Sequence, residues 1–192
     1  MLNTPRGRRA PVVCRVVPLL AIVGFLALGG VAPALQQGAV DGEWRAYGGD
    51  HASTGYSPLD QITADNVADL EIVWEWTGRN FGSRAETRSE TRPLMIDGVL
   101  YATAGRRRSV VAIDPGTGET LWMYRLDVGE RGTEAPRPNS GRGVAYWSPD
   151  GSGNGARIFV ITPGYHLIAL DVTNGRPISE FGEDGILDLM IG

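Results

Sequence analysis

The chain has 192 residues, of which 42% are hydrophobic and 21% charged, so it suits one or two globular domains and is not disordered. Its 27 glycines follow no Gly-X-Y period, which excludes a collagen helix and indicates many tight turns. From residue 35 onward the chain holds 14 arginines, no lysine and 22 acidic residues, and this net charge of −8 argues against a nucleic-acid partner.

Residues 1–37 have the order of regions found in a secretory signal peptide. Four arginines and no acidic residue precede the end of the apolar run Val16–Leu28, and Ala32-Pro33-Ala34 then offers the small residues of a cleavage site. An uncleaved inner-membrane anchor is the alternative, because residues 16–35 are just long enough to span a membrane. Either interpretation predicts that residues 38–192 form a domain in the periplasm or outside the cell. The single cysteine lies in the N-terminal segment, so the later residues offer no thiolate or disulfide.

The elements predicted after this segment are one short helix and a series of strands. Residues 63–70 predict a helix with Thr63 as its N-cap. Short runs rich in β-branched and aromatic residues predict strands, and turn residues separate them. The predicted strands are Leu70–Trp76, Val99–Ala104, Ser109–Ile113, Thr120–Leu126 and Arg157–Ile161. The three arginines 106–108 are interpreted as a hairpin tip.

A sequence repeat organises these strands. Residues 98–122 and 155–178 share the order strand, turn, strand and Ala-x-Asp, and their aspartates lie 57 positions apart. The strand predicted before them is a partial third copy, in which Trp74 takes the place that Trp122 holds in the first full copy. Several short strands in each unit of this size predict a β-propeller.

The repeated residues have physical roles in such a fold. Ala112 is small where neighbouring sheets approach, Asp114 accepts hydrogen bonds from the turn backbone, and Gly118 supplies a positive φ. Trp122 is large enough to dock on the adjacent sheet and close the gap between them.

A long segment between the two copies has a different composition. Residues 127–156 contain few strand-like runs and many Gly and Pro, which is typical of a functional loop. Asp150, Ser152 and Asn154 have the spacing that begins a calcium loop, but Ile161 stands where the final calcium-binding Glu would be. We therefore interpret this motif as a surface turn.

Residues 112–122 (AIDPGTGETLW) match the tryptophan-docking motif AxDxxTGxxxW of quinoprotein alcohol and glucose dehydrogenases. Residues 44–50 (WRAYGGD) and 142–147 (RGVAYW) match this family as well, and the similarity covers roughly residues 42–192. The chain therefore resembles the N-terminal part of a dehydrogenase that uses pyrroloquinoline quinone (PQQ). The second docking motif departs from the pattern, since Ser179 stands where Trp is expected.

This resemblance implies an all-β fold, an eight-bladed propeller of which this truncated chain supplies the first two to three blades. It also implies PQQ near the propeller axis, a Ca²⁺ ion beside the quinone and an Asp that acts as a base. The Ca²⁺ ligands and this Asp belong to later blades, so we expect them beyond residue 192 and expect no catalytic or metal-binding residue in this chain. The implied substrate is an alcohol, polyol or aldose sugar, and the implied electron acceptor is a membrane quinone or cytochrome c.

Three residues match family positions that contact PQQ. Glu90 would contact the edge of PQQ, and its alternative role is a solvated loop residue. Arg142 would hold PQQ carboxylates, because a guanidinium is a planar and permanently charged fork, and its alternative role is to staple the loop to a carbonyl. Thr162, which follows the strand Arg157–Ile161, would also touch PQQ or is simply a strand-end threonine.

Other functions stay open on the sequence alone. Many alcohol-oxidising relatives carry adjacent cysteines shortly before this arginine, and residues 127–141 have none, which favours the glucose, polyol and quinate branch. A non-catalytic PQQ-repeat propeller scaffold of the cell envelope would need the docking motifs but no cofactor arginine. A stand-alone small β domain is the third hypothesis, although so few repeats cannot bury their faces.

Overall fold

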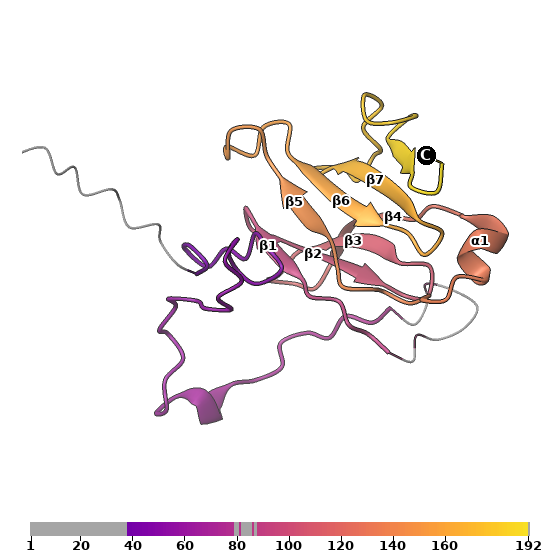
Figure 1. The fold of residues 1–192 in the computed structure, drawn as a ribbon. Helices are drawn as coiled ribbons and strands as arrows, with labels where there is room; N and C mark the ends of the chain where they lie inside the picture. The colour runs from indigo at the N-terminus through magenta and orange to yellow at the C-terminus, as the bar shows by residue number, and fades with distance from the viewer. Residues whose placement is uncertain (1–37, 79–80, 82–85, 87, 192) are drawn as a thin grey trace, which may run out of the picture. The chain divides into compact units, whose positions relative to one another are not determined.

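A computed structural model describes residues 38–78, 81, 86 and 88–191 (Figure 1), which all belong to a compact unit that spans residues 36–192. The predicted signal or anchor segment, residues 1–37, lies outside the described residues. Within the described part of the chain, no helix has both the length and the apolar character that crossing a membrane requires.

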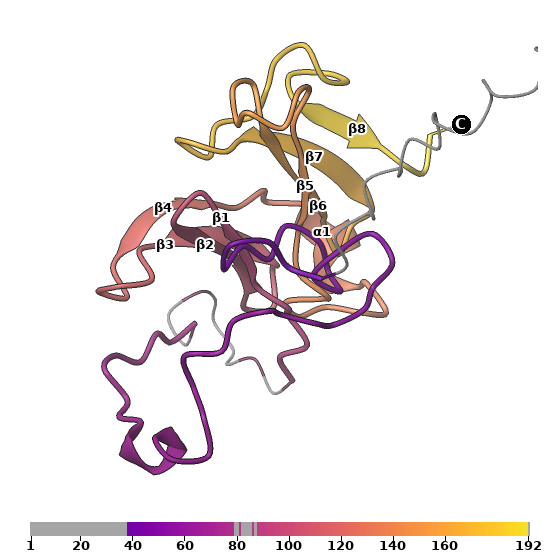
Figure 2. The same cartoon turned by 90° about the vertical axis from the view of Figure 1, so that its left-hand side faces the viewer.

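The described residues form two four-stranded antiparallel sheets with the same topology. The first sheet has the order β1 (Leu94–Ile96), β2 (Val99–Ala104), β3 (Ser109–Ile113) and β4 (Thr120–Tyr124), and the second has the order β5 (Ala145–Trp147), β6 (Arg157–Ile161), β7 (His166–Asp171) and β8 (Ile186–Asp188). Figure 2 shows the two sheets one above the other. A short helix, α1 (Gly129–Thr133), lies in the connection between the sheets. Each sheet is a meander, in which neighbours in sequence are also neighbours in space.

The strand predictions within the two sheets are confirmed. Strands β2, β3 and β6 have the predicted bounds, and β4 ends two residues earlier than predicted. The predicted hairpin tip at residues 106–108 connects β2 to β3. Alternation along β1 and β6 buries every second side chain against the neighbouring sheet, as a half-buried strand requires.

Two predictions for the region before the sheets are wrong. Residues 63–70 form only a 3₁₀ turn, η1 (Val67–Asp69), and the Asn66 side chain accepts a hydrogen bond from the Thr63 backbone N–H (2.7 Å) just before it. Leu70–Trp76 is irregular rather than a strand. None of the described strands pairs with its backbone, and a strand needs such a partner.

The core lies between the two sheets. Fully buried side chains of both sheets meet there, among them Leu94, Ile96, Val110, Ile158, Ile168 and Leu170. Ala112 belongs to the same core and is fully buried, as predicted for a small residue where sheets approach. Tyr101 also lies in this core, and its hydroxyl donates to the Val172 carbonyl (3.1 Å). Burial raises the pKa of Tyr101 to about 12.

Tryptophans join each repeat to the next as the sequence predicted. The Trp122 ring lies against Gly175 in the turn after β7, and its N–H donates to the Val172 carbonyl (3.2 Å). Trp74 docks on the corresponding turn of the first sheet, residues 114–118, where its N–H donates to a backbone carbonyl (2.9 Å). The tryptophan of one unit therefore covers the Asp-to-Gly turn of the following unit, which couples neighbouring units through both apolar contact and a hydrogen bond.

The meander topology brings certain loops to the same end of the sheets. Adjacent strands are antiparallel, so the segments that lead into β1 and β5 lie at the same end as the β2–β3 and β6–β7 turns. Glu90 and Arg142 lie in the two lead-in segments, and Thr162 lies in the β6–β7 turn. All three residues predicted to contact a cofactor are therefore found at one end.

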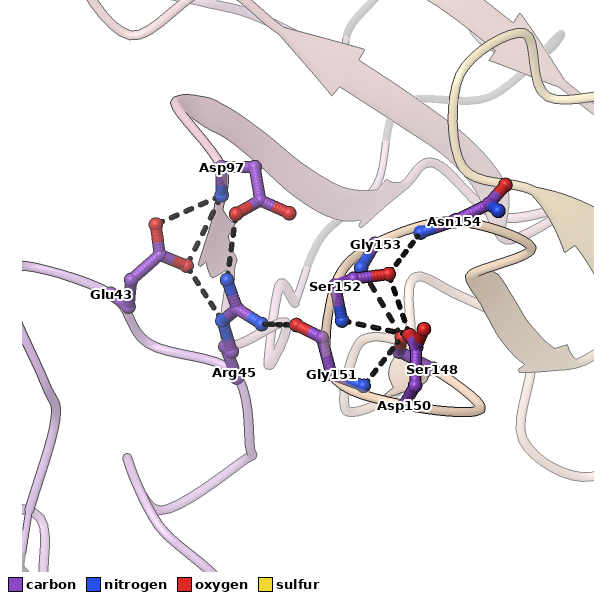
Figure 3. A network of polar contacts seen from close by, with 9 residues as sticks. All are labelled: Glu43, Arg45, Asp97, Ser148, Asp150, Gly151, Ser152, Gly153 and Asn154. Carbon is purple, nitrogen blue, oxygen red and sulfur yellow. Dashed lines mark hydrogen bonds and ion pairs between the residues drawn. The ribbon is translucent and has the colours of Figure 1, made fainter.

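A polar network holds the opposite end together (Figure 3). The Arg45 guanidinium donates to the carboxylates of Glu43 (3.0 Å) and Asp97 (2.7 Å) and to the Gly151 carbonyl (3.5 Å). The carboxylate of Glu43 in turn accepts a bifurcated hydrogen bond from the Asp97 backbone N–H through both of its oxygens. The network thus ties the N-terminal segment to the β1–β2 turn and to the β5–β6 loop.

The calcium-like motif lies in this β5–β6 loop. One carboxylate oxygen of Asp150 accepts hydrogen bonds from the backbone N–H (2.9 Å) and the hydroxyl (2.6 Å) of Ser152. These local bonds lower the pKa of Asp150 and close the loop on itself. The motif is thus an exposed turn in the structure, and its lack of a calcium role stays a prediction.

Candidate functional site

A cavity of about 880 Å³ lies at the end where the lead-in segments gather. This volume is within the range of sites that hold small organic molecules. The wall includes Tyr47, most of loop 136–144 and part of β6, together with side chains from the segment before β1. The second sheet and the loop segments therefore both line the cavity.

One main-chain hydrogen bond joins the two lead-in segments. The Arg92 N–H donates to the Arg142 carbonyl (3.3 Å). Gly143 permits this approach, because it adopts a φ of +107° and a Cβ at its position would lie 2.7 Å from the Arg92 carbonyl oxygen. As a result, Glu90 and Arg142 line the same cavity.

The guanidinium of Arg142 is largely available to a ligand. It is exposed, and one of its nitrogens donates to the Tyr47 hydroxyl (3.3 Å). No carboxylate among the described residues forms an ion pair with it. Since a guanidinium has five N–H donors, most of them are left to bind an anion that enters the cavity.

Glu90 has a cationic neighbour in the same wall. Its carboxylate lies 2.6 Å from the Arg88 guanidinium, and the two side chains are 46% and 76% exposed. An ion pair this exposed contributes little to stability, so the carboxylate can exchange this partner for a ligand at low cost.

Thr162 is not brought to the cavity wall. It is buried, and its hydroxyl oxygen accepts a hydrogen bond from the His166 backbone N–H (3.1 Å) and lies 3.3 Å from the His166 ring nitrogen Nδ1. The residue before it, Ile161, does line the cavity. The structure thus shows Thr162 holding the β6–β7 turn, and its contact with PQQ stays a prediction.

The same turn is tied to the connection between the sheets. Arg131 of α1 donates to the Gly164 carbonyl (2.6 Å) and binds the Asp188 carboxylate through two nitrogens (2.7 and 3.0 Å). This bidentate contact lowers the pKa of Asp188. The helix therefore fixes one side of the long connection to the second sheet.

Arg108 holds the other side of that connection, a role that the sequence did not predict. Its three nitrogens donate to the backbone carbonyls of Arg137 (3.1 Å), Asn139 (3.2 Å) and Ile161 (2.8 Å). Burial lowers the pKa of this guanidinium, and the Glu86 carboxylate acts in the opposite direction. No local signal distinguishes Arg108 from the two arginines before it.

Glu86 holds the same loop from a second direction. One carboxylate oxygen accepts a hydrogen bond from the Ser140 N–H (2.7 Å), and the other accepts one from the Gly105 N–H (3.1 Å). Together, Arg108 and Glu86 fix the backbone of residues 137–140, which leads directly to Arg142. We call these two residues the loop clamp.

Comparison with known proteins decides the family. Residues 44–192 match the sequence profile of the glucose/ethanol/alcohol dehydrogenase β-propeller domain, a PQQ domain. The chain belongs to this quinoprotein dehydrogenase family. Its two meander sheets with tryptophan docking are accordingly part of a β-propeller, and the predicted fold class is confirmed.

Relatives of this quinoprotein chain are named as dehydrogenases of alcohols. It is 37% identical over 144 residues to the 1-butanol dehydrogenase (cytochrome c) of Thauera butanivorans, covering 74% of this chain and 19% of that protein. It is 30% identical over 169 residues to the glycerol dehydrogenase large subunit of Gluconobacter oxydans, covering 84% and 22%. The crystal structure of the quinohemoprotein alcohol dehydrogenase from Comamonas testosteroni matches 78% of this chain and 20% of that one, with 30% identity and a TM-score of 0.61.

The quinoprotein chain thus spans about a fifth of the length of the relatives that it matches. A europium-containing methanol dehydrogenase, at 24% identity and a TM-score of 0.55, supports the fold. Among the residues that the structure describes, no group of three or more His, Cys, Asp or Glu side chains is placed to hold a metal ion.

The cavity fits the chemistry of PQQ, which carries three carboxylates. Four arginines, namely Arg88, Arg108, Arg137 and Arg142, line it, and Glu90 is its one acidic lining residue among those described. The chain as a whole is acidic, with a net charge of −4, so a cationic cavity is a local feature. Donors of this type bind planar carboxylates bidentately.

Proposed function

We propose that this chain is the N-terminal part of an exported PQQ-dependent dehydrogenase that oxidises an alcohol, a polyol or an aldose sugar. Two observations support the substrate class: relatives are named for butanol and for glycerol. Relatives named for cytochrome c and for quinone support one of these two as the electron acceptor. The location of Glu90 and Arg142 in the wall of one cationic cavity carries the proposal.

In this proposal each residue has a defined task. PQQ, when bound, supplies the two-electron oxidation of the substrate carbon. Arg142 would bind a carboxylate of the cofactor, and Tyr47 would orient the guanidinium through the hydrogen bond to its hydroxyl. Glu90 would contact the cofactor edge and offset part of the surplus positive charge. The Ca²⁺ ligands and the catalytic base would come from parts of the protein beyond residue 192.

Binding of PQQ to the full-length gene product tests the proposal. We expect the apoprotein to bind PQQ in equilibrium dialysis and the Arg142→Gln variant to bind it about tenfold more weakly or worse, because a charge-assisted contact is lost. Arg176→Gln is the matched control, since Arg176 is exposed and lies in the turn after β7 outside this cavity. A wild-type protein that binds no PQQ would instead identify a non-catalytic propeller scaffold.

Export is proposed from residues 1–37 alone. N-terminal sequencing of the protein recovered from a periplasmic extract checks it. A mature chain that begins near residue 35 supports a cleaved signal, and an intact N-terminus in the membrane fraction supports the anchor formed by residues 16–35.

A further inference from the structure

Arg137 lies in a backbone segment that is restrained on both sides. Proline precedes and follows it, which limits the backbone dihedral angles available to the three residues. Its own carbonyl and that of Asn139 accept hydrogen bonds from the half-buried Arg108 guanidinium (3.1 and 3.2 Å). The main chain at Arg137 is therefore fixed in place before any ligand binds.

The side chain of Arg137, in contrast to its backbone, is not held by other described residues. Arg137 is exposed and lines the same cavity as Arg142. Its side chain has no hydrogen bond or ion pair with any of the residues described. Arg45, Arg88, Arg107 and Arg131, in contrast, each form an ion pair with a carboxylate.

The charges of the cavity then divide into two groups. Arg88 forms an ion pair with Glu90. Arg108 donates its hydrogen bonds to backbone carbonyls and lies near the Glu86 carboxylate. Arg137 and Arg142 are the two cations of the wall that are left for a ligand, within the described residues. Two free guanidinium groups on one pre-fixed loop suit a molecule with more than one carboxylate.

We propose that Arg137 is a second carboxylate-binding residue of the cavity and that it acts together with Arg142 on the same polycarboxylate. This inference rests on the proposed function, since PQQ is the polycarboxylate in question. It assigns to the Pro-Arg-Pro sequence of the loop a binding role that complements the RGVAYW motif after it.

The test measures PQQ binding to the full-length apoprotein and three variants, by equilibrium dialysis at several salt concentrations. Arg137→Gln removes the charge and keeps most of the side-chain length, Arg137→Lys keeps the charge, and Arg125→Gln is the control because Arg125 is exposed and outside the cavity. We expect Arg137→Gln to raise the Kd about tenfold and to reduce its salt dependence, Arg137→Lys to recover part of the affinity, and the control to match wild type.

A second ligand separates charge recognition from general damage to the cavity. The trimethyl ester of PQQ lacks the carboxylate charges, so wild type and Arg137→Gln should bind it with the same Kd. Thermal unfolding should also be unchanged in Arg137→Gln, because the side chain is exposed.

The outcomes distinguish this inference from the proposed function. If wild type binds PQQ and Arg142→Gln weakens binding while Arg137→Gln leaves the Kd and its salt dependence unchanged, the role of Arg137 is overturned and the proposed function stands. If wild type fails to bind PQQ at all, both are overturned. Equal weakening of PQQ and ester binding by Arg137→Gln also contradicts the inference, since it indicates a structural effect.

Discussion

Identical side chains perform different tasks in this protein according to what their donors bind. Arg108 is half-buried and donates to three backbone carbonyls, whereas Arg142 is exposed with most donors free. The sequence predicted a site residue at Arg142 because a motif surrounds it. It could not predict the loop clamp, because the partners of Arg108 lie 29 to 53 positions away and become neighbours only after folding.

Replacement of Arg108 should destabilise the protein. We expect Arg108→Gln in the full-length protein to lower the free energy of unfolding by about 1–2 kcal/mol, because three backbone carbonyls, one half-buried and two exposed, lose a charged donor. Arg107→Gln is the control, since its ion pair with Asp127 is exposed and long (3.7 Å), and it should cost under about 1 kcal/mol. Urea unfolding curves measure both, and equal costs would rule out the clamp.

Strands could be predicted from the sequence where a short apolar run also has a neighbouring strand to pair with in the fold. β2, β3 and β6 match their predicted bounds because each is a short apolar run with a strand on both sides. Leu70–Trp76 has a similar pattern but lacks a described strand partner, and only its docking tryptophan behaves as predicted. The short strands β1, β5 and β8 went unpredicted, because three residues are too few to show a periodic pattern.

The tryptophan contact between units predicts a specific cost for one glycine. A Cβ on Gly175 would clash with the Trp122 ring, so Gly175→Ala must displace the indole and should cost about 1–3 kcal/mol beyond the strain of a positive φ. Gly98→Ala isolates that strain, because Gly98 also has a positive φ (+77°) and nothing within 4 Å of the added Cβ. Thermal unfolding of both variants measures the difference, and equal losses would contradict docking as an energetic link.

At the scale of the whole molecule, the described part leaves apolar side chains in solvent before and after its two sheets. Ile72 and Val73 are 89% and 83% exposed, and Met190 and Ile191 are 66% and 79% exposed. Two sheets of a propeller cannot cover their own outer faces, and the matched segment is only about a fifth of each relative. The repeat spacing predicted that the chain contains too few units to bury its own faces. Only the structure shows which surfaces remain uncovered.

We therefore expect residues 38–192 to behave poorly when produced alone. The isolated segment should self-associate or unfold without a sharp transition, because exposed apolar surface of this kind favours association. Size-exclusion chromatography and calorimetry check this against the full-length protein. A monomer with a sharp, reversible thermal transition would refute the expectation.

The hydrogen bond between the Arg92 N–H and the Arg142 carbonyl has one more consequence. Both atoms belong to the main chain, so the separation of the two lead-in segments does not depend on which side chains they carry, as long as Gly143 is retained. The side chains at positions 90 and 142 can therefore be replaced without changing the backbone that positions them. Substitutions at positions 90 and 142 can change the charge and the hydrogen-bonding groups presented to a ligand, while the distance between the two backbone positions stays constant.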